Sequence, residues 1–174
     1  MRHTSDFRPF LAALCALALS ACAEAERYDA AGDIHALLVA VRNDDKAGFD
    51  AHVDRKALKK QLRARLTAEA ARRIGGNEGA AALGAALAGP IADMATDLLV
   101  QPEAFRAVAD YMGYGEDRPI PNALVIAQGL RRVDDDHVCV ARSKDGPCIL
   151  IFADEDHAWR LTGYVGDLGL IRGK

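Results

Sequence analysis

The hydrophobic pattern of this chain changes from helical to strand-like late in its length. Up to residue 113, apolar residues recur every three or four positions, as on one face of a helix. After Gly113-Tyr114-Gly115 and the prolines that follow, four short apolar runs are separated by turn residues at close spacing. Strands joined by tight turns form an antiparallel meander. The order of the two parts predicts an α+β domain, with N-terminal helices packed on a C-terminal sheet of about four strands.

The helical part, residues 29–113, contains recognisable start and stop signals. Asp54 is a candidate N-cap for a helix that ends at Gly75-Gly76. Pro90 is expected to kink or restart the next helix, whose apolar face would then continue with Ile91, Met94 and Leu98. Pro102 fits the first position of a further helix. The segment 123–128 could form either a helix or a strand.

The sheet is expected to form a meander spanning about residues 129–172. In the second and third runs both alternating faces are apolar, so these strands should be central and covered on both sides. The predicted strands are residues 130–134, 137–142, 148–153 and 158–164.

The amino-terminal end has the layout of a signal peptide. A positively charged start precedes an apolar run from Phe10 to Leu19, which is shorter than the roughly 20 residues that cross a bilayer. The run closes on Leu19-Ser20-Ala21-Cys22, which resembles the lipobox of bacterial lipoproteins. That resemblance implies cleavage after Ala21, a diacylglycerol on Cys22 and a fatty acid such as palmitate on the new amino end. The alternative is an ordinary secretory signal with a chance cysteine near its end.

The lipobox reading divides the chain into three parts. Residues 1–21 would be a lipoprotein signal peptide, residues 22–28 a lipid-anchored tether, and residues 29–174 a single domain. Two or three acyl chains give durable anchoring, whereas one is marginal. We therefore expect a protein of the cell envelope that faces the periplasm and contacts the membrane through its anchor. Ala23 follows the cysteine where an aspartate would suggest retention at the inner membrane, which favours the outer membrane.

Export also constrains the cysteines and the partners. Cys139 and Cys148 remain in the mature chain and flank a turn-like stretch, so we predict a disulfide between them in an oxidising compartment. A metal pair or a redox-active dithiol is less favoured, because the spacing is not Cys-x-x-Cys and no neighbouring ligand completes a set. The chain carries a net charge of −3, which together with export argues against nucleic acid as a partner.

Two blocks of residues together resemble a bacterial family catalogued as domain of unknown function 2939. The first block runs from an acidic break at Asp44-Asp45 through Phe49-Asp50-Ala51-His52-Val53-Asp54 into a helix with Leu58 and Leu62; the second is Trp159-Arg160-Leu161. The resemblance brings no agreed activity, so it implies no catalytic residue. The arrangement is also similar to the nuclear-transport-factor-like cone fold, an analogy that carries no function.

Two acidic, histidine-containing turns form the first candidate site. They join the first strand to the second and the third to the fourth, and alternate turns of a meander lie at the same end of the sheet. About two strand spacings, ~10 Å, would separate them. A divalent cation between them is one hypothesis; solvated turn residues are the alternative. The candidate metal ligands are Asp134, Asp136, His137, Asp154, Asp156 and His157.

The second candidate is a cluster of basic residues on the helix after Asp54. Beside a lipid anchor such a helix could rest on anionic lipid, each cation contributing up to about 1 kcal/mol. An ordinary solvated helix face is the alternative. The residues are Arg55, Lys56, Lys59, Lys60 and Arg63.

Catalytic patterns are otherwise lacking in the sequence. Ser143 is the only serine after the predicted cleavage site, and no nucleophile-elbow sequence surrounds it. His35 and His52 are isolated, and acid–base work would need a pairing such as His52 with Asp54. The sequence thus predicts neither a catalytic residue nor a cofactor, and favours a non-enzymatic module that binds an envelope protein or another envelope component. The alternative is an envelope hydrolase or metal-binding protein that uses the acidic turns, which a pocket with converging polar groups would favour.

Overall fold

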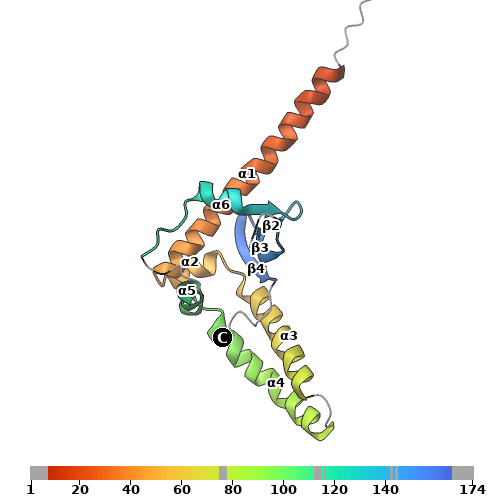
Figure 1. Ribbon diagram of the computed structural model, residues 1–174, viewed down its shortest axis with the longest axis vertical. Coiled ribbons are helices and arrows are strands. Elements are labelled where there is room, and N and C mark those ends of the chain that lie inside the picture. The colour runs from red at the N-terminus through yellow and green to blue at the C-terminus, as the bar shows by residue number, and fades with distance from the viewer. Residues whose placement is uncertain are drawn as a thin grey trace, which may run out of the picture.

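The α+β architecture is as predicted, with six helices followed by four strands in the described part of the chain (Figure 1). The computed structural model describes residues 8–74, 78–111, 115, 117–141, 143 and 145–165 of the 174-residue chain. The helices are α1 (Arg8–Arg42), α2 (Lys46–Ala51), α3 (Arg55–Ile74), α4 (Glu78–Leu99), α5 (Pro102–Tyr111) and α6 (Ala123–Gly129). The strands are β1 (Leu130–Arg132), β2 (His137–Ala141), β3 (Cys148–Glu155) and β4 (Ala158–Tyr164).

The sheet is the expected antiparallel meander, with strand order β1-β2-β3-β4. Its central pair, β2 and β3, places Val138 opposite Phe152. A register shift between Ile151 and Phe152 bends the edge pair β3 and β4. The predicted end of the meander, beyond residue 165, lies outside the described residues.

Side-chain caps fix where the short helices start. Asp45 Oδ1 accepts hydrogen bonds from the backbone N–H groups of Ala47 and Gly48, both at 3.1 Å, and so begins α2. Asp54 Oδ1 accepts from the N–H of Ala57 at 2.9 Å, which confirms it as the N-cap of α3. Segment 123–129 is a helix, α6, whose first turn is capped by Asn122. These caps satisfy donors that the helix itself leaves free.

The hydrophobic core lies between the helices and one face of the sheet. Its fully buried large side chains include Phe49 of α2, Phe152 of β3 and Leu161 of β4. Phe49 also stacks edge-on against Phe105 of α5, with 5.1 Å between ring centroids. A parallel bridge between Val53 and Leu161 ties the chain between α2 and α3 to the sheet. The Val53-Asp54 pair thus joins a buried anchor to a helix cap.

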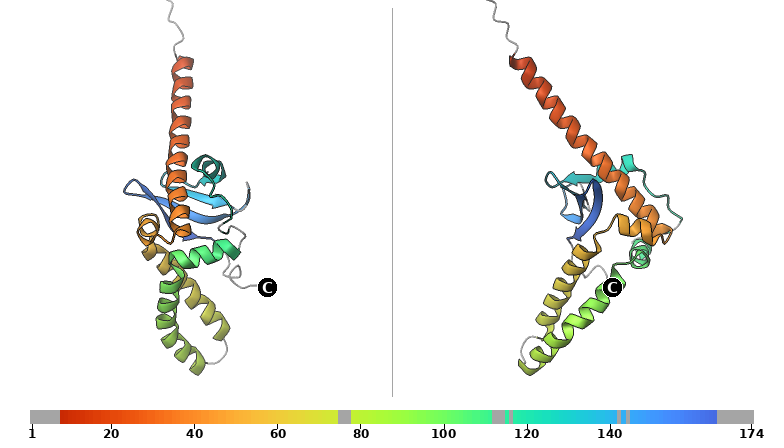
Figure 2. Two further views of the ribbon diagram at one scale, coloured as in Figure 1. Left: turned by 90° about the vertical axis from the view of Figure 1, so that its left-hand side faces the viewer. Right: turned by 180° about the vertical axis from the view of Figure 1, so that it is seen from behind.

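The other face of the sheet differs from the prediction. We expected β2 and β3 to be covered on both sides, which holds only in part: the helices lie on one face (Figure 2), and on the other face Cys139 and Ala153 are buried. Ile149 and Ile151 alternate with the core-facing Leu150 and Phe152 and are only partly buried. A strand that is apolar on both faces could be buried on both. Whether a second layer of helices or strands covers its outer face depends on the rest of the fold.

Helix α4 also differs from the prediction. Of the two outcomes expected at Pro90, a kink or a restart, the restart does not occur, because the helix is continuous through Pro90; it packs along α3, with Arg63 Nη1 3.0 Å from Asp93 Oδ1. The side turned to α3 buries Ala92 and Thr96. The face that begins at Ile91 is therefore solvent-exposed, with Ile91 62% and Met94 66% exposed.

Helix α1 extends over residues that the sequence assigned to the signal peptide and the tether. It is continuous from Arg8 to Arg42, so the expected tether, residues 22–28, is helical. Glu26 forms an ion pair with Arg132 at 3.4 Å, and Arg27 Nη2 donates to the carbonyl of Leu130 at 3.2 Å. The helix is thus docked on the domain three residues before the predicted boundary at 29. Within the described residues, no helix combines the length and apolarity needed to span a membrane.

Candidate functional site

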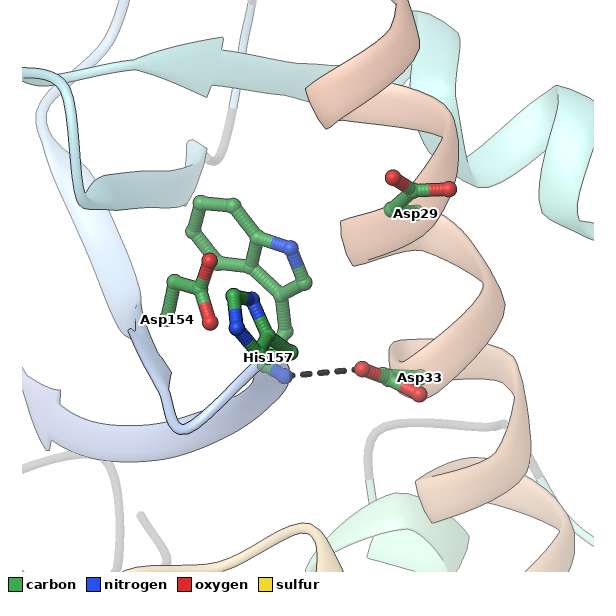
Figure 3. A pocket seen from close by; sticks show the side chains of 5 residues that line it. Asp29, Asp33, Asp154 and His157 are labelled. Carbon is green, nitrogen blue, oxygen red and sulfur yellow. Dashed lines mark hydrogen bonds between the residues drawn. The ribbon is translucent and has the colours of Figure 1, made fainter.

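A half-open hollow of about 280 Å³ lies where α1 passes the turn between β3 and β4 (Figure 3). Asp29 and Asp33 come from α1, where a spacing of four residues places both on one face of the helix. Asp154 from the end of β3, His157 from the turn and Trp159 from β4 complete the lining. Figure 3 shows Asp154 and His157 across the hollow from the two α1 carboxylates.

Asp33 holds α1 against β4. Its Oδ2 accepts a hydrogen bond from the backbone N–H of Trp159 at 2.7 Å. Its Oδ1 lies 3.8 Å from Nδ1 of His52, a buried nitrogen that has no hydrogen-bond partner among the described residues. The pairing imagined for His52 is therefore with Asp33 and not with Asp54, whose carboxylate caps α3. Asp33 therefore both joins α1 to β4 and contributes a negative charge to the lining of the hollow.

Trp159 forms the apolar wall of the hollow. Only 5% of its surface is exposed, so it anchors the last strand in the core. Within the described residues its indole N–H makes no hydrogen bond, and the nitrogen is not among the buried unpartnered atoms, so water can reach it. Because Trp159 lines the hollow, the small exposed part of its indole opens into that space.

A tight two-residue turn presents His157. Asp156 and His157 both adopt left-handed backbone conformations, with φ of 55° and 64°, between the paired residues Glu155 and Ala158. This is the geometry of the turn whose twist best matches a hairpin, although asparagine and glycine are its usual residues. Non-glycine residues rarely adopt this conformation, but aspartate and histidine do so more often than most, so this pair of residues is compatible with the turn that borders the hollow.

The two acidic turns do lie side by side, as predicted. The backbone N–H of Asp154 donates to the carbonyl of Asp136 at 2.9 Å. Within its own turn, His137 Nδ1 lies 2.7 Å from Asp134 Oδ1, and this hydrogen bond is the main cause that lowers the pKa of Asp134. Over the described ranges, no group of three or more His, Cys, Asp or Glu side chains is arranged to hold a metal ion. The shared metal site stays a prediction.

Residues 11–108 match the family described as protein of unknown function (DUF2939). The chain belongs to the DUF2939 family. No curated protein and no solved structure shows a significant similarity to it. In this DUF2939 protein the matched region contains Asp29 and Asp33, whereas Asp154 and Trp159 lie beyond it. The second sequence block of the resemblance, Trp159-Arg160-Leu161, is likewise outside the match.

The basic residues of α3 in the DUF2939 protein mostly have partners within the chain. Arg55 pairs with Asp50, Lys59 with Asp97, and Arg63 with Asp93. Lys56 and Lys60 are exposed. Helix α3 therefore offers an anionic surface fewer unengaged cations than its sequence suggested, and contact with anionic lipid stays a prediction.

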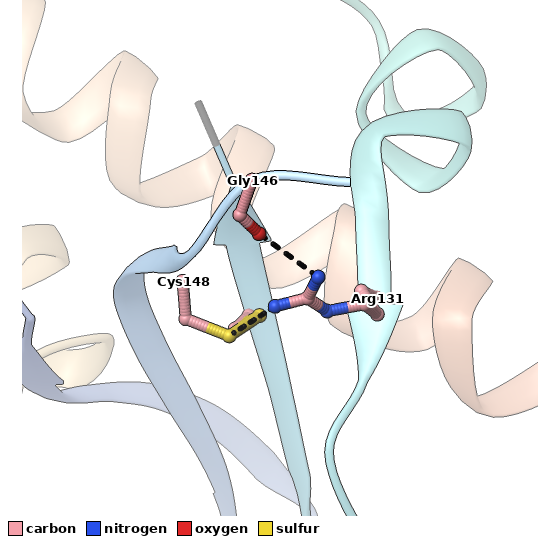
Figure 4. The surroundings of a disulfide bond; sticks show 4 residues. Arg131, Gly146 and Cys148 are labelled. Atoms are coloured by element: carbon pink, nitrogen blue, oxygen red, sulfur yellow. Dashed lines mark hydrogen bonds between the residues drawn. A yellow bond between two sulfur atoms is a disulfide. The ribbon is translucent and has the colours of Figure 1, made fainter. Parts of the chain in front are cut away.

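The predicted disulfide is present between Cys139 on β2 and Cys148 at the start of β3, with Cα atoms 5.6 Å apart. Arg131 on β1 reaches across to it (Figure 4). One guanidinium nitrogen lies 3.0 Å from Sγ of Cys148, and the other donates to the carbonyl of Gly146 at 2.9 Å. The bond and the arginine together fasten the turn between β2 and β3, at the opposite end of the sheet from the hollow.

Sequence reasoning found two of the five residues around the hollow as candidate ligands, Asp154 and His157. It missed Asp29 and Asp33. Their spacing of four residues was visible, but it is a common feature of any solvated helix. Nothing in the pattern indicated which face of the first helix would meet the turn between the last two strands.

Proposed function

We propose that this protein is a lipid-anchored module of the cell envelope that acts by binding a partner and not by catalysis. The observation that carries the proposal is the order Leu19-Ser20-Ala21-Cys22 directly ahead of a folded domain. The Cys139–Cys148 disulfide supports it, because such bonds persist in oxidising compartments such as the periplasm. The proposed placement faces the periplasm, at the outer membrane more than the inner.

The residues around the hollow support binding over catalysis. They are three aspartates, one histidine and one tryptophan, and they include no hydroxyl or thiol nucleophile. Ser143 lies in the turn between β2 and β3, at the other end of the sheet. An envelope protein or another envelope component that fits the hollow is the proposed partner, and nucleic acid is not.

The anchor is tested by mass spectrometry of the protein isolated from its own cells. The expected amino-terminal peptide begins at Cys22 and carries the mass of two or three acyl chains. A Cys22→Ala variant is the control and should leave the membrane fraction. An intact Met1 would overturn both export and anchoring. A cleaved terminus without acyl mass would support the ordinary secretory signal and overturn the anchor alone.

A second candidate function is supported by the same hollow. Asp154 and His157 line it together with the carboxylates of α1, and carboxylates and imidazoles are the residue types that metal-assisted hydrolases use as ligands. Calorimetry of the purified protein with calcium and with zinc tests it. Saturable heat that is lost in Asp154→Asn would establish a metal site in the hollow. Absence of heat with both ions would remove this candidate.

A further inference from the structure

We propose that the hollow between α1 and the β3–β4 hairpin binds an organic cation: an ammonium or guanidinium group with a hydrogen-bond acceptor beside it. A lysine or arginine of a partner peptide, or a small free amine, would supply that chemistry. The inference names the ligand of the binding module proposed above, and so rests on that function. Its determinants are Asp29, Asp33, Asp154 and the indole of Trp159.

Charge is the first argument. Three carboxylates face one small space, and His157 is the only lining residue that can carry a positive charge. Within the described part of the chain, the side chains of Asp29 and Asp154 have no hydrogen bond or ion pair. Elsewhere, neighbouring acids such as Asp93 and Asp97 are neutralised by basic residues of α3. A cation in the hollow would be attracted by the three carboxylates that line it and would reduce their mutual repulsion.

The indole of Trp159 is the second and independent argument. A tryptophan that is 95% buried usually gives its N–H a partner. Here no acceptor is present among the described residues, although three carboxylates line the same space. Because the indole nitrogen is not among the buried unpartnered atoms, water can reach it, and a ligand acceptor such as the carbonyl of a peptide unit would take the place of that water. A bare metal ion offers no acceptor, which favours an organic cation.

Size and rigidity fit such a group. About 280 Å³ lies at the lower end of ligand pockets, roughly 300–1,000 Å³, which suits one side chain or a small amine. The walls belong to α1, β3 and β4, elements that share the core with Leu161 and Phe152. The bond from Trp159 to Asp33 fixes the relative position of two of these walls before any ligand arrives. Little ordering is left to oppose binding.

The test uses the single tryptophan of the chain, which gives one indole N–H signal in a proton–nitrogen correlation spectrum. The full-length protein is titrated with acetyl-lysine methylamide and acetyl-arginine methylamide, each to about 10 mM, a range that detects weak small-ligand sites. Acetyl-norleucine methylamide is the uncharged control, spermidine is a cation without a carbonyl, and calcium chloride is the metal arm. We expect the two charged amides to shift the indole signal saturably, and norleucine to leave it unchanged.

Matched variants locate the effect. Asp29→Asn and Asp154→Asn keep the size of the side chain, and each should weaken binding about tenfold or more by removing one charge. Asp110→Asn, at an exposed carboxylate on α5, changes the net charge equally and should leave the affinity unchanged. The remaining signals of the same spectra show that each variant is folded.

Each outcome of the titration either supports or overturns the proposed ligand. Binding of the charged amides but not of spermidine assigns the site to a peptide; comparable binding of spermidine assigns it to free amines as well. A shift with calcium alone, no saturable shift, or equal affinity in Asp29→Asn, Asp154→Asn and Asp110→Asn would overturn the proposal. The titration measures ligand binding in the hollow and does not depend on the lipid anchor. If Cys22 is acylated but no charged amide binds, the proposed ligand is rejected and the proposed lipid anchor is retained.

Discussion

The carboxylate of Asp33 on α1 accepts a hydrogen bond from the backbone N–H of Trp159 on β4, at 2.7 Å and across 126 residues of sequence. The bond serves two parts of the fold at once. It provides an acceptor for a partly buried donor on an edge strand, and it places a negative charge beside the indole of the same residue. The structural role and the proposed binding role of Asp33 can be separated by substitution.

The first prediction concerns that acceptor. Asp33→Ala leaves the N–H of Trp159 without a partner, and we expect the free energy of unfolding to fall by about 1–3 kcal/mol. Asp33→Asn keeps an acceptor oxygen and should cost clearly less. Urea denaturation followed by circular dichroism measures both variants. Equal losses for the two would show that the charge, and not the hydrogen bond, holds α1 to β4.

The disulfide gives the second prediction. It closes a short loop between Cys139 and Cys148, which are nine residues apart. Chain entropy predicts that the double variant Cys139→Ala/Cys148→Ala lowers the free energy of unfolding by about 2–3 kcal/mol. Reduction of the unaltered protein should lower it by a similar amount, which serves as the control. Unchanged stability in the double variant would contradict this reading of the bond.

The third prediction is a pH dependence at the turn between β1 and β2. The hydrogen bond from His137 lowers the pKa of Asp134 below its ordinary 3.8. A lowered pKa means that the stabilisation from this carboxylate is present above about pH 4 and is lost as the pH falls through the folded value. Carbon-detected titration should find the pKa of Asp134 below 3.8 and should find it closer to 3.8 in His137→Leu. A pKa of Asp134 that His137→Leu leaves unchanged would rule out the histidine as the cause.

The fourth prediction concerns the core. Phe49 is fully buried, stacks on Phe105 and carries the guanidinium of Arg55 5.3 Å from its ring centroid. Phe49→Ala should lower the free energy of unfolding by about 3–5 kcal/mol, because a large cavity remains. Leu124→Ala on α6, where the leucine is 50% exposed, is the matched control and should cost little. Comparable losses at the two positions would mean that Phe49 is not a centre of the core.

Local chemistry made much of the fold predictable. The cap at Asp54, the order of helices and strands and the Cys139–Cys148 pair depend on neighbouring residues, which sequence patterns report directly. The α6 segment was ambiguous because seven residues are too few for periodicity to separate a helix from a strand. Its cap at Asn122 was the signal that could have decided it.

Long-range packing was the part that could not be predicted. The hollow exists because Asp29 and Asp33 meet a turn more than a hundred residues later, and no local pattern encodes that meeting. The same limit explains Ile91 and Met94, whose helical spacing indicated an apolar face but not whether another element would cover it. Periodicity shows which residues share a face; tertiary packing decides what that face contacts.

The unbroken course of α1 restricts how far the domain could reach. Cys22 and Glu26 are four positions apart, and at ~1.5 Å per helical residue this spans only about 6 Å; the side chain of Glu26 is docked on the sheet through its ion pair with Arg132. A fatty-acylated Cys22 would then hold β1 and α6 next to the headgroups, with no slack to search the space beyond. Whatever enters the hollow would have to be delivered to the membrane surface.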